Sequence, residues 1–106
     1  MKKFVFNEHG VCTEPERIVV FEKDGLNKIV IGVAFSEWGW SVGYEVWARH
    51  SGTVSPCSLR ENYPTREQAV NVALNCIEKL NVVEENPRYL KMIRTFKASR
   101  MQLTLF

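Results

Sequence analysis

The sequence predicts a small α+β domain in which an antiparallel meander of three or four strands precedes two helices. Three short segments rich in β-branched and aromatic residues fill the first half of the chain, with turn-forming residues between them. Two segments with apolar residues at helical spacing follow. At 106 residues the chain can build one modest core. We therefore expect a single β-β-β-α-α domain over residues 1–100, followed by a mobile C-terminal tail over residues 101–106.

The three predicted strands span residues 17–23, 28–35 and 40–49. Asp24-Gly25 supplies a turn after the first strand, and residues 36–39 supply the second turn. Short connections of this kind join neighbouring antiparallel strands, which gives the meander. A short piece at residues 4–6 or 53–55 is a candidate for an additional edge strand.

Alternation along the strands gives the predicted sheet two unlike faces. One face carries large apolar side chains and should meet the first helix; its residues are Ile29, Ile31, Val33, Phe35, Trp40, Val42, Tyr44 and Val46. The opposite face is small-sided, and its residues are Val30, Gly32, Ala34, Ser41, Gly43, Glu45, Trp47 and Arg49. Val19 and Phe21 should also point there. Because contiguous apolar surface is seldom left bare, we favour coverage of this face by the second helix, with a ligand stacked on Trp47 as the alternative.

The first helix is predicted from Thr65 to about Leu80. Thr65 can cap the helix, while Gln68, three residues later, completes a capping box. The apolar residues of this segment recur at helical spacing and should pack on the sheet; they are Val70, Ala73, Leu74, Ile77 and Leu80.

The second helix is predicted from Arg88 to about Ser99. Asn86-Pro87 breaks the chain before it, and Pro87 suits a first helical turn. Its apolar stripe consists of Tyr89, Met92, Ile93 and Phe96.

The net charge of +2 hides an uneven distribution along the chain. Residues 1–87 carry 9 Lys and Arg against 12 Asp and Glu, which gives −3. Residues 88–106 carry no acid and +5, from Arg88, Lys91, Arg94, Lys97 and Arg100. Such a basic stretch is typical either of a solvated helix face or of contact with DNA or an acidic partner.

The sequence predicts a cytoplasmic protein. The first residues lack a secretory apolar region, and no run approaches membrane-spanning length. Cys12, Cys57 and Cys76 are odd in number, widely spaced and without a CxxC pair, which indicates reduced thiols.

No constellation of residues predicts catalysis, a cofactor or a metal. His9 and Cys12 form an H-x-x-C pair, but structural zinc sites prefer tighter paired spacings. Local motifs for a catalytic triad, a Cys-His pair or a phosphate loop are missing. We therefore expect a protein without enzymatic activity.

The last residues, Gln102-Leu103-Thr104-Leu105-Phe106, place three large apolar side chains at a chain end, where side chains are usually polar. This segment resembles the short linear motif by which bacterial replication and repair proteins dock on the DNA polymerase III sliding clamp. The preferred form of that motif is Gln-Leu, then Ser or Asp, then Leu-Phe. Four of the five positions match, and Thr104 is small and hydroxylated like the commoner serine.

The resemblance implies that Leu103, Leu105 and Phe106 enter apolar pockets of the clamp, while the Gln102 amide fixes the register by hydrogen bonding. It also implies an accessory protein acting at replicating or repaired DNA. Proteins of phages, plasmids and conjugative elements carry such motifs too, so capture of a host clamp by a mobile element is a natural version of this hypothesis. A hydrophobic clasp that folds back on the protein's own domain is the structural alternative for this segment.

Two other functions stay open from the sequence. A small nucleic-acid-binding module could use the basic second helix with Trp47 and Arg49 for phosphate contacts and base stacking. An oligomerising structural protein could use its C-terminal segment to clasp a neighbouring subunit.

Overall fold

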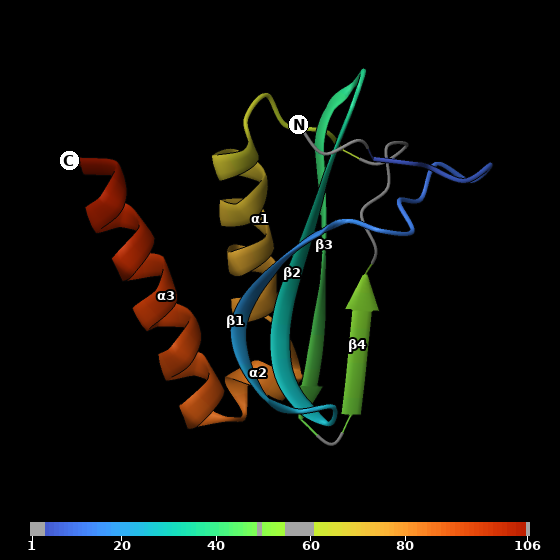
Figure 1. Cartoon of the computed structure of the whole chain (residues 1–106). Helices are drawn as coiled ribbons and strands as arrows, with labels where there is room; N and C mark the ends of the chain where they lie inside the picture. The colour runs from blue at the N-terminus through green and yellow to red at the C-terminus, as the bar shows by residue number, and fades with distance from the viewer. Residues whose placement is uncertain (1–3, 49, 55–60, 106) are drawn as a thin grey trace.

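The computed structural model describes residues 4–48, 50–54 and 61–105 and confirms the α+β class (Figure 1). Four strands come first: β1 (Glu16–Asp24), β2 (Asn27–Ser36), β3 (Gly39–Ala48) and β4 (His50–Val54). The helices follow as α1 (Arg66–Glu78), α2 (Asn81–Glu84) and α3 (Pro87–Leu105). The short helix α2 was not predicted from the sequence.

The strands form one antiparallel sheet in the order β1-β2-β3-β4, as expected for a meander. The turn after β1 is fixed by Asp24, whose carboxylate accepts hydrogen bonds from the backbone N–H of Leu26 (2.8 Å) and the side chain of Asn27 (3.2 Å). The turn before β3 needs a glycine. Gly39 has φ 117°, and a Cβ there would lie 2.8 Å from the carbonyl oxygen of Tyr63.

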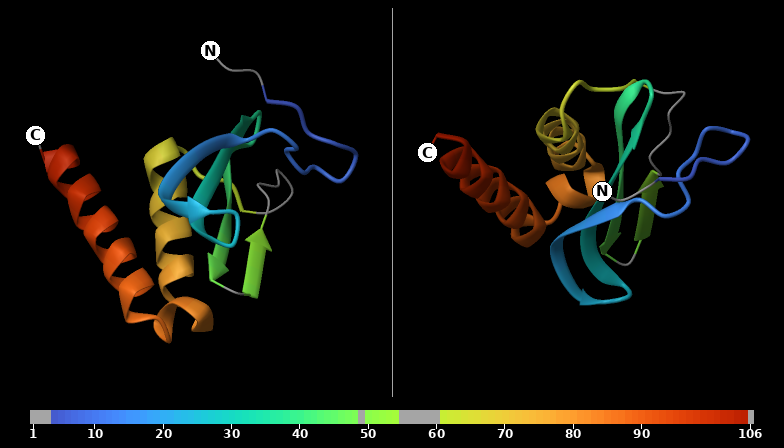
Figure 2. Two further views of the ribbon diagram at one scale, coloured as in Figure 1. Left: turned by 60° about the horizontal axis from the view of Figure 1, so that its bottom comes forward. Right: turned by 45° about the horizontal axis from the view of Figure 1, so that its top comes forward.

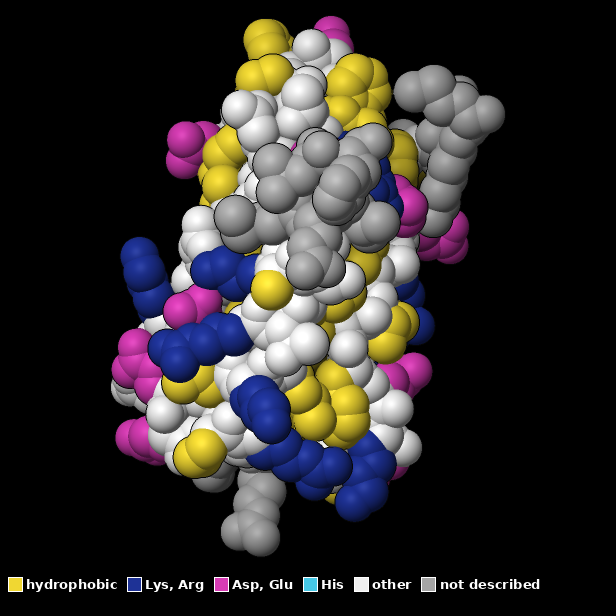
Figure 3. Space-filling model, turned by 90° about the vertical axis from the view of Figure 1, so that its left-hand side faces the viewer, with side chains coloured by type: hydrophobic (Ala, Val, Ile, Leu, Met, Phe, Trp, Pro, Cys, Tyr) yellow, Lys and Arg dark blue, Asp and Glu magenta, His cyan; other side chains and the backbone are white. Residues whose placement is uncertain are grey.

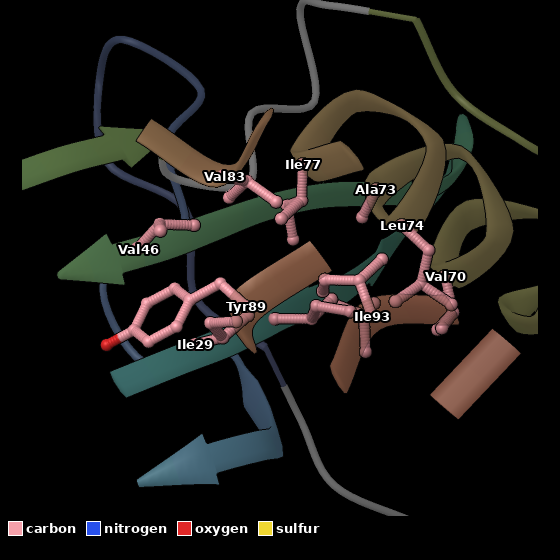
Figure 4. Close-up of a cluster of buried hydrophobic side chains, with 11 residues drawn as sticks. Ile29, Val46, Val70, Ala73, Leu74, Ile77, Val83, Tyr89 and Ile93 are labelled. Atoms are coloured by element: carbon pink, nitrogen blue, oxygen red, sulfur yellow. The ribbon is translucent and has the colours of Figure 1, made fainter. Parts of the chain in front are cut away.

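The helices α1 and α3 lie on the same side of the sheet (Figures 1 and 2). The core between the layers is formed by buried side chains of β2, β3 and the helices, several of which Figure 4 labels: Ile29, Ile31, Val33, Val46, Val70, Ala73, Leu74, Ile77, Val83, Tyr89 and Ile93. The predicted face of β2 and β3 therefore meets the first helix. Phe35 is an exception at 41% exposure, because it lies beside the β2–β3 turn. Its ring meets that of Trp40 at an angle of 53°, with 5.2 Å between the centroids.

The second predicted helix does not cover the small-sided face of the sheet. Helix α3 packs against α1, α2 and β1 instead. The connections on either side of α2 are short, so α3 stays next to α1. These connections have too few residues to carry α3 to the other face of the sheet. The N-terminal segment lies on the side away from the helices (Figures 1 and 2), and its Cys12 is buried.

A β-bulge in β1 also changes the predicted facing of Phe21. Val19 pairs with Val30, but Phe21 pairs with Ile29, so Val20 is an extra residue in the ladder. The extra residue moves Phe21 to the helix side, where its ring meets Tyr89 edge-on at 5.6 Å between centroids. Val19 remains on the other side and is 47% exposed.

The N-terminal ends of both long helices are capped by side chains. The Thr65 hydroxyl accepts a hydrogen bond from the backbone N–H of Gln68 at 3.1 Å, as predicted. Asn86 caps α3 by accepting from the N–H of Tyr89 at 3.3 Å. Helix α3 is longer than predicted, since it continues past Ser99 to Leu105. Neither Gly nor Pro follows Ser99, and Met, Gln and Leu are good helix formers.

Candidate functional site

The basic residues of α3 fall into two groups with different surroundings. Lys97 Nζ lies 2.8 Å from Glu78 Oε2, and Arg94 Nε lies 3.7 Å from Glu78 Oε1. Arg100 pairs with Glu67, and its guanidinium lies 6.0 Å from the ring centroid of Phe96. These three cations therefore bind α3 to the acidic residues of α1.

The ion pairs on α1 change the acidity of Glu78. The hydrogen bond from Lys97, supported by the charge of Arg94, lowers the pKa of the Glu78 carboxyl below its ordinary value. A larger fraction of Glu78 therefore stays ionised at acidic pH than of a free glutamate. Its contacts with Lys97 and Arg94 join α1 to α3.

Arg88 and Lys91 form the second group. Both are exposed, and neither has an ion pair among the residues that the structure describes. They stand one turn apart on α3, at spacing i and i+3, so their charges lie on one side of the helix. They are the cations of α3 that are free to meet a partner.

A groove of about 480 Å³ lies between α3 and the edge strand β1, beside these two cations. Its lining residues are Val20, Phe21, Arg88, Lys91, Met92, Thr95, Phe96 and Ser99. Figure 3 shows this side of the molecule, where Lys and Arg side chains gather around a strip of hydrophobic side chains. The sequence predicted the apolar stripe of α3 that includes Met92 and Phe96, but it did not predict the groove. The groove depends on the β-bulge that turns Val20 and Phe21 toward α3, and no residue pattern in the sequence indicates that bulge.

A second hollow of about 520 Å³ runs along the other flank of α3. All of its described lining residues belong to α3, among them Leu90, Lys91, Arg94 and Ala98. Lys91 and Thr95 line both hollows. The groove beside β1 is different, because its described lining comes from two elements.

Trp47 does not share a surface with Arg88 and Lys91. Its neighbour Val46 is buried against the helices, so alternation places the Trp47 side chain on the opposite face of the sheet. The indole is half-buried, and its Nε1 is buried without a hydrogen-bond partner in the described part of the chain. Arg49 lies outside the described residues. A combined stacking and phosphate-binding surface is therefore not assembled from Trp47 and α3.

The predicted docking segment forms the end of α3. The backbone of residues 102–105 is helical, while Phe106 lies outside the described residues. Arg100 is the last residue whose side-chain contacts the structure describes.

Within residues 4–48, 50–54 and 61–105, no three His, Cys, Asp or Glu side chains come together as metal ligands would. Cys12 and Cys76 are free thiols, and Cys57 falls outside the described ranges. Over the same part of the chain, no helix combines the length and apolar character that crossing a membrane requires.

Comparison with known proteins gives no relative. The chain matches no protein-family model, no curated protein and no solved structure. Functional inference therefore depends on the residues, contacts and motif of this chain itself.

Proposed function

We propose that this protein is a non-enzymatic accessory protein that docks on the bacterial sliding clamp through residues Gln102–Phe106. The observation that carries the proposal is the sequence of this segment, which matches the clamp-binding motif at four of five positions. The remaining position, Thr104, keeps a small hydroxylated side chain. Docking of this kind recruits a protein transiently to replicating or repaired DNA, and a phage or another mobile element is a natural source of such a protein.

The fold supports the proposal by holding the segment at the end of an anchored helix. Tyr89 and Ile93 bury the first half of α3 in the core, and Arg100 ties its second half to α1 through Glu67. The segment follows this last anchor directly along the chain. Binding to a clamp can therefore involve residues 102–106 without disturbing the core.

The helical backbone of residues 102–105 adds a step to docking. In an α-helix, positions two apart do not face each other, yet the motif needs Leu103 and Leu105 to reach neighbouring apolar pockets. The last turn of α3 must therefore unwind as the clamp binds. Helix ends are the least stable part of a helix, so this local opening has a small cost.

Burial of three large apolar side chains contributes on the order of 5–8 kcal/mol. Unwinding the helix end and fixing the peptide in one conformation oppose this contribution. The net affinity expected for the isolated interaction is micromolar, within about tenfold. An affinity of this size suits transient recruitment.

Titration of fluorescently labelled clamp with three forms of the protein tests the proposal. The full chain should bind, whereas a chain lacking residues 102–106 should not. Phe106→Ala should weaken binding by about thirtyfold or more, since truncation of an aromatic anchor costs about 2 kcal/mol. Leu26→Ala is a matched control, because Leu26 is an apolar side chain that is 66% exposed in the β1–β2 turn.

The control variant should bind the clamp like the unchanged protein. Equal binding by the full and shortened chains, or no binding by either, would refute the proposal. Circular dichroism of each variant checks that the domain remains folded.

A further inference from the structure

We propose that the groove between α3 and β1 is a second docking site, which binds an acidic peptide segment of a partner protein. This site is separate from the C-terminal motif and does not depend on clamp binding. The occupant is an extended segment that carries apolar anchors with Asp or Glu beside them. The proposal rests on the apolar floor of the groove, on its two unpaired cations and on the open edge of β1.

The floor of the groove is apolar and built from side chains that the core holds in place. Val20, Phe21, Met92 and Phe96 line it, and all four also pack against the core cluster. The Phe21 ring is further held by its edge contact with Tyr89. A surface formed in this way exists before a ligand arrives, so binding requires little rearrangement.

The charge of the groove selects an acidic ligand. Arg88 and Lys91 belong to its lining, and no Asp or Glu is among the lining residues that the structure describes. Arg94, Lys97 and Arg100 on the same helix are paired with acids of α1, whereas Arg88 and Lys91 have no acidic partner within the described ranges. A carboxylate placed beside them would form charge-assisted hydrogen bonds, and a basic segment would be repelled.

The shape of the groove favours an extended peptide over nucleic acid. The strand β1 is at the edge of the sheet, so one side of its backbone has no neighbouring strand among the described residues. The bulge at Val20 interrupts this edge and limits long strand pairing, which leaves side-chain anchoring as the main source of affinity. A nucleic acid would lay its phosphates over an apolar floor whose described lining includes two cations, Arg88 and Lys91, an arrangement that gains little from counterion release.

Selection from a library of random peptides tests the proposal directly. Phage-displayed peptides of about a dozen residues are selected on the full chain, and the most enriched sequence is synthesised. We expect enriched sequences to combine apolar residues with Asp or Glu. In NMR titration of the full chain, this peptide should shift the resonances of Val20, Phe21, Met92 and Phe96 most strongly.

Two charge reversals provide a matched pair of variants. Lys91→Glu lies in the groove, and Lys79→Glu reverses another exposed lysine at the C-cap of α1, which is not among the lining residues of the groove. Lys91→Glu should weaken binding of the selected peptide by about tenfold or more, and Lys79→Glu should change it by less than about twofold. Phe106→Ala should leave peptide binding intact, which separates this site from the clamp motif.

Several results would overturn the assignment. A selection that yields no enriched sequence, or enriched sequences without acidic residues, excludes an acidic ligand. Equal weakening by the two lysine variants would place the peptide elsewhere. A single-stranded oligonucleotide of about a dozen nucleotides that binds more tightly than the peptide and loses affinity in Lys91→Glu would assign the groove to nucleic acid.

Discussion

Tyr89 connects three elements of the fold through a single side chain. It is 4% exposed, and its hydroxyl donates a hydrogen bond of 2.8 Å to the backbone carbonyl of Trp47 on β3. Its ring meets Phe21 on β1, and its backbone belongs to α3. The start of α3 is consequently fixed against both β1 and β3, which also defines one end of the groove.

Replacement of Tyr89 by Phe should keep the packing and remove the hydrogen bond. Loss of the bond leaves the Trp47 carbonyl without this donor, so the free energy of unfolding should fall by about 1 kcal/mol at neutral pH. The measurement is urea denaturation followed by far-UV circular dichroism. A change below a few tenths of a kcal/mol would contradict the contribution assigned to the hydroxyl.

The same variant tests the titration of Tyr89. Burial raises the pKa of its hydroxyl, and the negative charge of Asp24 acts in the same direction while Arg88 opposes it. A raised pKa in the folded state means that stability is complete below the ordinary tyrosine value of about 10 and is lost as the pH rises through the folded value. Tyr89→Phe should therefore lose less stability than the unchanged protein as the pH rises above the ordinary tyrosine value of about 10. Burial also raises the pKa of Tyr63, so part of the alkaline loss should persist.

At the scale of elements, α3 is held to α1 by ion pairs as well as by apolar packing. The Glu78 carboxylate forms ion pairs with both Lys97 and Arg94, and its side chain is 27% exposed. Each partly exposed ion pair of this kind contributes at most about 1 kcal/mol to the free energy of unfolding. Their role is to set the angle and register of α3, with the core supplying most of the stability.

Glu78→Gln should destabilise the domain by about 0.5–1 kcal/mol at neutral pH, because it removes two ion pairs from a partly exposed site. The lowered pKa of Glu78 means that the stabilisation is present above the ordinary glutamate value of about 4.5 and disappears as the pH falls through the folded value. The variant should thus lose less stability on acidification than the unchanged protein. Urea denaturation over a series of acidic pH values measures this difference.

Glu84→Gln is the control for this prediction. Glu84 is an exposed residue of α2 that has no ion pair in the part of the chain the structure describes. Its replacement should leave the free energy of unfolding at neutral pH unchanged. If the two glutamine variants behave alike, the ion pairs of Glu78 contribute nothing measurable.

The elements that sequence reasoning located are those with strong local signals. The strands coincide with β-branched runs between turn residues. Helix α1 follows Thr65, and the side chain of Thr65 caps it as the sequence predicts. Local signals of this kind could not predict which side of the sheet α3 covers. It depends on the length of the connections around α2, and a one-residue bulge at Val20 reverses the facing of Phe21.

The candidate site was predictable in part. The basic residues of α3 are evident in the sequence, but their division into paired and free cations depends on Glu67 and Glu78 of a different helix. The groove was not predictable, since it requires the β1 bulge and the placement of α3 against β1. The predicted docking motif is the opposite case, because its evidence is the sequence of residues 102–106, and the structure adds the helical backbone of residues 102–105.

At the scale of the whole molecule, the fold and the proposed clamp partner compete for the same residues. Residues 102–105 belong to α3 in the free protein, and docking needs them unwound. The apparent affinity for the clamp is therefore lower than that of the unwound peptide, by a factor set by the stability of the last helical turn. A change that weakens this turn without touching the motif should strengthen docking.

Met101→Gly makes such a change, because glycine destabilises a helix by about 1 kcal/mol relative to alanine. Compared with Met101→Ala, the glycine variant should bind the clamp more tightly, by up to about fivefold. Both variants keep residues 102–106, so titration of labelled clamp compares the helix end alone. The amide protons of residues 102–105 should also exchange faster in the glycine variant. Weaker binding by the glycine variant would mean that the clamp receives the segment as a helix, and the unwinding step would then be wrong even though the docking itself is retained.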